Sequence, residues 1–229
     1  MPVTVSAAVA VVVATVQAVT FATKDGWTIA ASYRPASKGN ATVVLAHGVG
    51  SAGVEWARFS EALAAKGVGT LALDLRGHAG SRLGPKGSTD HAGFDAWGAW
   101  PAAAEDLRAA AVWLKSKGVP DGRIAFGGAS IGANLASVVA VERKTAPFLL
   151  LLSPSGNYRG VLLKTRKGLK TFAAASPADG YAFVGVKELE SRKAAAVLYA
   201  PGGHGVQMFD DPATFERIVA WTKAAAAPR

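Results

Sequence analysis

Residues 124–143, IAFGGASIGANLASVVAVER, decide the fold. IAFGG predicts a short buried strand, and the stretch from Ile131 onward predicts a helix. The turn between them, Gly128-Ala129-Ser130-Ile131-Gly132, matches G-x-S-x-G, a pattern of little weight by itself in a chain with 26 glycines. A nucleophilic serine at a sharp turn requires this strand–turn–helix setting, and small flanking residues let such a turn form. Ser130 is therefore the candidate nucleophile; the alternative is a structural turn in which Ser130 caps the helix.

A serine hydroxyl needs a general base, and the candidate among the four histidines is His204. It lies in PGGHG, residues 201–205, between the last expected strand and the last expected helix. It is also the one histidine that follows Ser130, as the chain order serine, acid, histidine demands. His47, in contrast, ends an expected strand and is predicted to be structural.

The acid that orients His204 should follow a strand that lies between Ser130 and His204 in the chain. Asp179 meets this condition, because it comes after LKTFAAA and before a predicted helix. The alternative role for Asp179 is to cap that helix. Glu188 and Glu190 are rival acids, but they fall inside the helix at positions expected to face solvent.

Two backbone N–H groups should stabilise the oxyanion that such a site produces. One is expected from Ile131, directly after the nucleophile. The other is expected from Val49, in the loop HGVG that follows the strand TVVLA. Gly48 and Gly50 would let the backbone turn toward a substrate at this point.

Outside this stretch, short apolar runs alternate with helical patterns. Strands are expected at 42–46, 69–73, 123–127, 148–152, 169–175 and 195–200, and helices at 55–66, 101–117, 131–144, 181–192 and 212–226. This alternation predicts an α/β fold, a mostly parallel sheet with helices on both faces. Asp25-Gly26, between strand-like runs at 20–23 and 28–34, predicts an N-terminal β-hairpin. Residues 19–229 are expected to form a single domain.

Together these motifs resemble the α/β-hydrolase family. The motifs are HG after the first parallel strand, DLRGHAGS after the next, GGASIG around Ser130, Asp179 at a strand end and His204 in GHG. The short chain and the stretch LSPSGNYRGV resemble its compact, dienelactone-hydrolase-like branch. The resemblance covers residues 19–225. It implies a triad and oxyanion donors formed by the candidate residues, with no cofactor and no metal: Ser130, Asp179, His204, Val49 and Ile131.

One departure from that branch bears on the substrate. Dienelactone hydrolases use a cysteine nucleophile, and this chain contains no cysteine. The resemblance therefore implies a serine hydrolase that cleaves small carboxylic esters through an acyl-enzyme, rather than dienelactone. The 16 residues between Leu152 and Leu169 leave no room for the folded cap that many members insert there, so an open site is expected. Trp97 and Trp100 are candidate substrate-binding residues, with core packing as the alternative.

A dinucleotide-binding enzyme is a second interpretation. Gly48, Gly50 and Gly53 match G-x-G-x-x-G after a strand, and Asp74 stands where the acid of that fingerprint binds a ribose. This interpretation leaves the candidate triad without a role. A catalytically inactive binding protein with a hydrolase fold is a third.

Residues 2–19 carry no charge and are mostly Ala and Val. Val16-Gln17-Ala18 resembles a small-residue cleavage site, so residues 1–18 predict a signal peptide, although no Lys or Arg precedes the apolar stretch. A membrane anchor and an additional buried strand are the alternatives. A signal peptide would make the protein secreted or periplasmic, with no stable membrane insertion after processing; without one, a cytoplasmic location is expected.

Charge and cysteine content limit the partners. There are 25 Lys and Arg against 16 Asp and Glu, a formal net charge of +9. The basic residues are scattered, with one tight group at Lys164, Arg166, Lys167 and Lys170, so a solvated surface is favoured over a nucleic-acid partner. The lack of cysteine excludes disulfides and a Cys-rich zinc site. The expected partner is a small-molecule ester, and the sequence does not indicate an oligomeric state.

Overall fold

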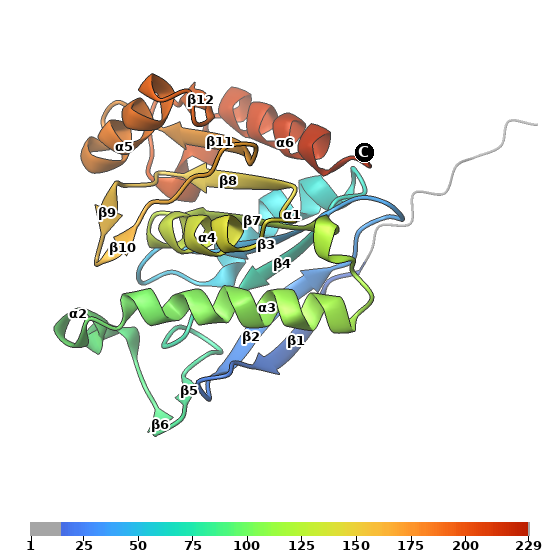
Figure 1. Cartoon of the computed structure of the whole chain (residues 1–229), viewed down its shortest axis with the longest axis vertical. Coiled ribbons are helices and arrows are strands. Elements are labelled where there is room, and N and C mark those ends of the chain that lie inside the picture. The colour runs from blue at the N-terminus through green and yellow to red at the C-terminus, as the bar shows by residue number, and fades with distance from the viewer. Residues whose placement is uncertain (1–14, 229) are drawn as a thin grey trace, which may run out of the picture.

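The computed structural model describes residues 15–228, except for the side chains of Ala96 and Trp97. Most of the predicted signal peptide, residues 1–14, thus lies outside the described residues. Eight strands form one sheet in the order β1-β2-β4-β3-β7-β8-β11-β12 (Figure 1). These strands are β1 (Gln17–Ala22), β2 (Thr28–Arg34), β3 (Thr42–Ala46), β4 (Gly69–Leu73), β7 (Ile124–Ala129), β8 (Phe148–Leu152), β11 (Lys170–Ala175) and β12 (Ala196–Tyr199).

The sheet is mostly parallel, as the sequence predicts. β1 and β2 are antiparallel to each other, and β2 is antiparallel to β4. The other strands pair in parallel from β4 to β12. The predicted N-terminal hairpin is confirmed, with Asp25-Gly26 in its turn and Gly26 at a φ of 88°.

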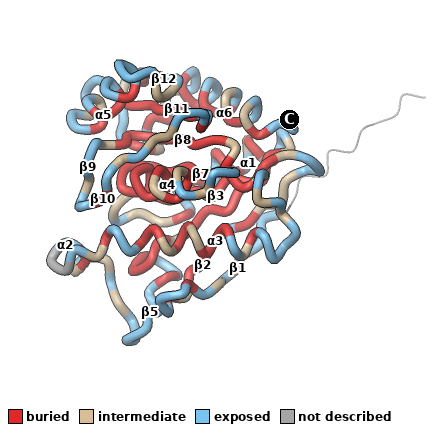
Figure 2. The backbone as a smooth tube through the Cα atoms, in the orientation of Figure 1, coloured by how far each residue is buried: buried red, intermediate tan, exposed pale blue. Residues whose placement is uncertain are grey.

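The central parallel strands β3, β4, β7 and β8 are buried along their whole length because both faces of the sheet are covered. In β3, Val44 and Ala46 join one hydrophobic cluster, while Val43 and Leu45 join the other. All five residues of β3 are buried, and so are all five of β8. Figure 2 shows this as a buried centre under a largely exposed outer layer.

Helices cover both faces of the sheet. Side chains of α3, α4 and α5 enter the first hydrophobic cluster, and those of α1 and α6 enter the second. The helices are α1 (Ala57–Ala64), α2 (Phe94–Trp97), α3 (Ala104–Ser116), α4 (Ile131–Glu142), α5 (Gly180–Ser191) and α6 (Pro212–Ala226). The predicted helices at 55–66 and 101–117 start later than expected, because 3₁₀ turns at Gly53–Trp56 and Trp100–Ala103 precede α1 and α3.

No folded cap lies between β8 and β11. The connection holds a two-stranded hairpin, β9 (Asn157–Tyr158) and β10 (Val161–Leu162). A second small hairpin, β5 (Leu83–Gly84) and β6 (Gly87–Ser88), follows β4. Within residues 15–228, the helices are too short or too polar to cross a membrane.

Candidate active site

Ser130 lies at the turn between β7 and α4. Its φ of 55° and ψ of −123° are rare for a residue other than glycine. The backbone N–H of Ser130 donates to the carbonyl of Leu152 at the end of β8, at 2.9 Å, which ties the turn to the neighbouring strand. Ser130 makes no side-chain capping hydrogen bond to α4. The side chain is therefore held at the strand end without serving the helix as a cap.

Two glycines make this turn possible. A Cβ atom on Gly132 would lie 2.2 Å from the carbonyl oxygen of Ala46 in β3, and one on Gly128 would lie 2.2 Å from the carbonyl oxygen of Gly132. Both distances are far below van der Waals contact, so α4 packs this closely on the sheet only because both side chains are absent. The G-x-S-x-G pattern is thus explained by backbone packing on both sides of the serine.

His204 and Asp179 come together from two strand ends. The Nδ1 atom of His204 lies 2.9 Å from each carboxylate oxygen of Asp179. Asp179 occupies the N-cap position of α5, but its side chain makes no capping hydrogen bond there. The backbone N–H of His204 donates to Oε1 of Gln207 at 3.1 Å, which anchors the histidine loop. A carboxylate at Nδ1 leaves Nε2 of the imidazole free to face a reacting hydroxyl.

These three residues line one cavity of about 240 Å³. Its other walls include Ser155 and Tyr158, from the connection after β8, and Tyr181, in the first turn of α5. His204 keeps 49% of its side chain exposed, and Asp179 keeps 16%. Within residues 15–228, no hydrogen bond joins Ser130 Oγ to His204 Nε2; in free enzymes such catalytic contacts are often long and tighten with substrate.

Ile131 directly follows the serine, and the loop that carries Val49 lies next to the serine. A Cβ on Gly48 would lie 3.5 Å from Cβ of Ser130, so the HGVG loop passes directly over the nucleophile. The N–H groups of Val49 and Ile131 have no hydrogen-bond partner in the described part of the chain. Both donors are therefore available to a ligand oxygen.

Histidines hold the HGVG loop. The Nδ1 atom of His47 lies 2.7 Å from the carbonyl oxygen of Gly48, and the Nε2 atom of His78 lies 3.3 Å from the N–H of Gly50. The rings of His47 and His78 are in edge contact, and His91 stacks on His78 with centroids 3.9 Å apart. Burial lowers the pKa of His47 to about 3 and also lowers the pKa of His78. Both rings are therefore neutral near pH 7, and His47 is structural, as predicted.

Two further contacts of the site were not anticipated from the sequence. Ser153, directly after β8, donates its hydroxyl to Oδ2 of Asp179 at 2.6 Å and accepts the N–H of Gly205 at 2.8 Å. Glu55 accepts the N–H of Gly48 at 3.3 Å and also binds Ser51. Burial raises the pKa of the Glu55 carboxyl. The signal for Ser153 was available, because it stands at the carboxyl end of a parallel strand next to β7.

The other residues considered from the sequence are not shown to contribute to this cavity. Trp100 is 1% exposed and packs on Phe94, while its indole N–H donates to Asp95 at 2.9 Å, so it belongs to the core and does not line the cavity. Trp97 ends α2, and its side chain lies outside the described residues. The rival acids are engaged elsewhere: Glu188 pairs with Arg192, and Glu190 pairs with Lys187.

The glycine-rich loop does not present a free ribose acceptor. The carboxylate of Asp74 accepts the N–H of Gly53 at 2.8 Å and the N–H of Gly80 at 3.1 Å. Gly53 itself packs against β4, where a Cβ would lie 2.9 Å from the carbonyl oxygen of Leu73. The Asp74 carboxylate therefore links the loops that contain Gly53 and Gly80 and is not free to bind a ribose. The described residues also contain no cluster of three or more His, Asp or Glu that could hold a metal ion.

A family model decides the relationship, because it matches residues 37–177, which span the HGVG loop and the serine turn. The chain belongs to the serine aminopeptidase S33 family. No curated protein matches the sequence. This S33 chain has the α/β-hydrolase fold, as its likeness to solved structures shows.

Three solved structures illustrate that likeness. A CIB-like hydrolase from Thermoplasma acidophilum has a TM-score of 0.71 at 17% identity, over 92% of this chain and 99% of that one. EstE1, a carboxylesterase from a metagenomic library, has a TM-score of 0.70 at 18% identity, over 94% of this chain and 90% of that one. Dienelactone hydrolase from Anabaena variabilis has a TM-score of 0.69 at 16% identity, over 93% of this chain and 96% of that one.

Proposed function

We propose that this S33 family member is a serine hydrolase that cleaves small carboxylic esters. The observation that carries the proposal is the pairing of Asp179 with Nδ1 of His204 in the cavity that also contains Ser130. The three residues follow three different parallel strands, and the shared carboxyl edge of the sheet brings them to one cavity. A hydroxyl, an imidazole and a carboxylate in this order form the machinery of acyl transfer.

The reaction follows from the atoms present. Ser130 Oγ attacks the ester carbonyl while Nε2 of His204 takes the hydroxyl proton, and Asp179 stabilises the imidazolium through Nδ1–H. The N–H groups of Val49 and Ile131 bind the oxyanion of the tetrahedral intermediate. The intermediate collapses to an acyl-enzyme as His204 returns the proton to the leaving alcohol. Water then attacks the acyl-enzyme by the same route and releases the acid.

Cavity size and exposure favour a short acyl group. The cavity of about 240 Å³ is smaller than the roughly 300–1,000 Å³ typical of ligand pockets. Its rim residue Tyr181 is 85% exposed, so a long chain leaving the cavity would remain in water. Each further methylene then gains little of the about 0.8 kcal/mol that full burial provides. Acetyl to butyryl esters should therefore be cleaved faster than palmitoyl esters.

The family name raises aminopeptidase activity as a competing substrate class. An aminopeptidase must bind a free α-ammonium group, which calls for an acidic side chain facing the substrate. Asp179 is the one acid that lines the cavity in the described chain, and its carboxylate is already bound by His204 and Ser153. The lining therefore favours an uncharged ester over a peptide with a free amino terminus.

The experiment combines covalent labelling with a substrate panel. A fluorophosphonate should label the wild type at Ser130 and leave Ser130→Ala unlabelled, with p-nitrophenyl acetate and butyrate hydrolysed by the wild type alone. Aminoacyl p-nitroanilides should be poor substrates. Unlabelled but folded wild-type protein would instead identify an inactive binding scaffold, and faster anilide than ester cleavage would overturn the substrate class.

A further inference from the structure

The end of the molecule where the parallel strands begin collects positive charge. The helices run back toward this end, so α1, α3, α4, α5 and α6 finish there (Figure 1). Lys and Arg are favourable at helix C-termini because they interact with the negative end of the helix dipole. Each of these helices carries such residues at or just after its end: Lys66, Lys115 and Lys117, Arg143 and Lys144, Arg192 and Lys193, and Lys223.

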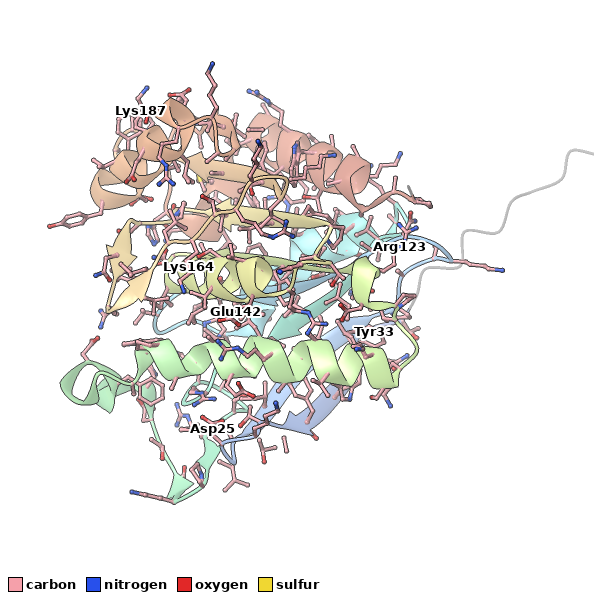
Figure 3. The ribbon with its side chains drawn as sticks, in the orientation of Figure 1. Asp25, Tyr33, Arg123, Glu142, Lys164 and Lys187 are labelled. Atoms are coloured by element: carbon pink, nitrogen blue, oxygen red, sulfur yellow. The ribbon has the colours of Figure 1, made fainter. Side chains whose placement is uncertain are left out.

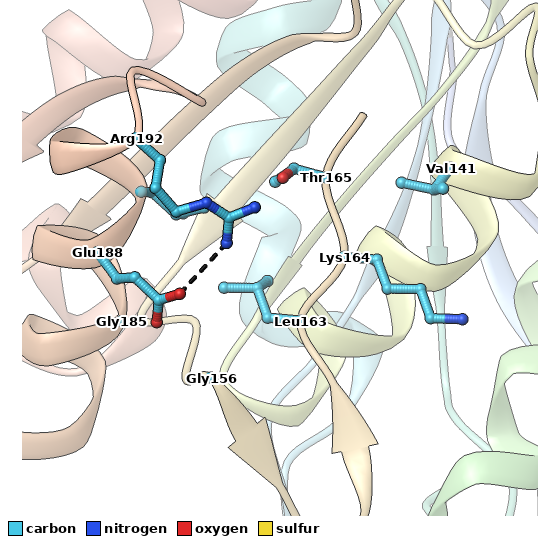
Figure 4. A pocket seen from close by; sticks show the side chains of 9 residues that line it. Val141, Gly156, Leu163, Lys164, Thr165, Gly185, Glu188 and Arg192 are labelled. Carbon is cyan, nitrogen blue, oxygen red and sulfur yellow. Dashed lines mark hydrogen bonds and ion pairs between the residues drawn. The ribbon is translucent and has the colours of Figure 1, made fainter. Parts of the chain in front are cut away.

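Two adjoining hollows at this end are lined by cations and by no acidic residue of the described chain. They have volumes of about 430 and 350 Å³ and share Arg166 and Gly168. Their basic residues, which we call the basic face, are Arg123, Lys144, Arg166, Lys167, Arg192 and Lys193. A third hollow of about 300 Å³ adjoins them through Thr165 and Arg192; there Glu188 pairs with Arg192 while Lys164 points away (Figure 4).

The charges of the basic face are largely not neutralised within the protein. Lys144, Lys167 and Lys193 are exposed and form no ion pair with any residue from 15 to 228. Arg166 donates to the carbonyl of Lys144 at 2.9 Å, but its Nε is buried without a partner.

Nearby acids are already engaged by other cations. Asp121 pairs with Arg143 and Lys115, and Glu142 pairs with Arg108. The helix dipoles explain where these cations lie, but they leave the charge of the basic face available to an external partner.

The apolar N-terminal stretch joins the domain at the same end. Gln17, the first residue of β1, pairs with Tyr33 near the end of β2. Arg34, which follows Tyr33, pairs with Thr70 near the start of β4. Figure 3 shows Tyr33 and Arg123 at this end of the molecule and Asp25 near the other. The residues before β1, 2–16, include no charged side chain. An apolar stretch therefore enters the domain at the end that carries the basic face.

We propose that the basic face docks on a surface of anionic phospholipid. Lipid headgroups supply the negative charge that the face lacks. In the unprocessed chain the acyl region beneath them also takes up apolar residues from the stretch before β1, whereas a chain cleaved after the predicted signal peptide docks through the basic face alone. A nucleic acid would satisfy the charge but offers no apolar medium for that stretch. Ser130, Asp179 and His204 follow strand ends on the opposite side, so a docked molecule keeps its cavity open to dissolved substrate.

Vesicle co-sedimentation of the full chain tests this docking. Binding should be stronger to phosphatidylcholine vesicles that contain phosphatidylglycerol than to phosphatidylcholine alone, and salt should weaken it. Each basic residue near an anionic leaflet contributes roughly fivefold to partitioning. The double variant Lys144→Glu/Lys167→Glu should therefore bind phosphatidylglycerol vesicles roughly 25-fold more weakly or worse.

A matched control uses two exposed lysines at the far end. Lys24 lies in the β1–β2 turn and Lys86 in the β5–β6 turn, and neither forms an ion pair with a described residue. Lys24→Glu/Lys86→Glu makes the same change in net charge and should bind vesicles nearly as the wild type does. Equal losses in the two double variants, indifference to phosphatidylglycerol, or tighter binding to duplex DNA than to vesicles would overturn the proposal. Hydrolysis of a soluble ester by both variants shows that they are folded and is independent of the docking result.

Discussion

The imidazole of His47 and the carbonyl of Gly48 are in direct contact, with Nδ1 and oxygen 2.7 Å apart. That oxygen belongs to the same planar trans peptide as the N–H of Val49, and the two point in opposite directions. The N–H of Leu75 donates to Nε2 of His47 at 2.9 Å, so Nδ1 carries the proton and donates to Gly48. His47 therefore sets the direction of the candidate oxyanion donor without touching a substrate.

His47→Ala should lower kcat for p-nitrophenyl acetate by about 10- to 100-fold. Removal of one oxyanion donor lowers kcat by about 10²–10³, and in this variant the donor would be misaligned rather than removed. KM should change little, since the loss falls on the transition state. His47→Gln should recover part of kcat, because its amide can both donate and accept. Unchanged kcat in His47→Ala, measured on folded protein, would show that the peptide is fixed by other contacts.

The depressed pKa of His47 predicts a specific dependence of stability on pH. Burial lowers this pKa to about 3, while an unfolded histidine titrates near pH 6.5. The neutral buried ring thus stabilises the protein fully above about pH 6.5, and this contribution is lost toward pH 3 at about 1.4 kcal/mol for each pH unit. The free energy of unfolding of His47→Gln should lie further below the wild-type value at pH 7.5 than at pH 4.5. Urea unfolding at the two pH values measures this, and a constant difference would contradict it.

The sequence predicts the strands and the triad candidates for related reasons. Runs such as TVVLA and FLLLL are long enough and apolar enough to be buried on both faces. Because the carboxyl ends of parallel strands share one edge, residues that follow them are expected to converge, and Asp179 and His204 do lie 2.9 Å apart. Ser153 stands at a strand end where a functional residue could have been expected, but its contacts with Asp179 and Gly205, like those of Glu55, depend on how loops from distant segments meet. The sequence left two roles open for Trp100, because a position just before a helix does not distinguish a ring in the core from one that walls a cavity; the structure places it in the core.

Asp179→Asn separates the two roles considered for this residue. Asparagine caps helices as well as aspartate does, and the Asp179 side chain makes no capping hydrogen bond in any case. The melting temperature should therefore stay close to that of the wild type. Activity should fall by about 10⁴ in kcat, because an amide can hold His204 in the wrong tautomer. Glu188→Gln is the control and should remain active. An active Asp179→Asn together with an inactive Glu188→Gln would identify Glu188, within α5, as the acid.

Ser153→Ala should affect both activity and stability. Its hydroxyl fixes Oδ2 of Asp179 at 2.6 Å and accepts the N–H of Gly205 at 2.8 Å. Loss of the buried acceptor should lower the free energy of unfolding by about 1–3 kcal/mol, and a freer carboxylate should lower kcat by roughly tenfold. Ser155→Ala, which alters the same cavity without removing a side-chain hydrogen bond, should keep the wild-type melting temperature. Equal melting temperatures for the two variants would deny Ser153 its bridging role.

Gly132→Ala tests the packing that lets the serine turn form. The new Cβ would lie 2.2 Å from the carbonyl oxygen of Ala46, so α4 must move away from β3 or the strand must bend. Overpacking of this kind costs about 3 kcal/mol or more when backbone is the obstacle, which corresponds to a loss of about 6 °C or more in melting temperature. Gly180→Ala is the matched control, because a Cβ at the first residue of α5 meets no atom within 4 Å and alanine favours a helix. That variant should melt at or slightly above the wild-type temperature. If Gly132→Ala melts at the same temperature as Gly180→Ala, the absence of a side chain at Gly132 is not what allows α4 to pack against the sheet.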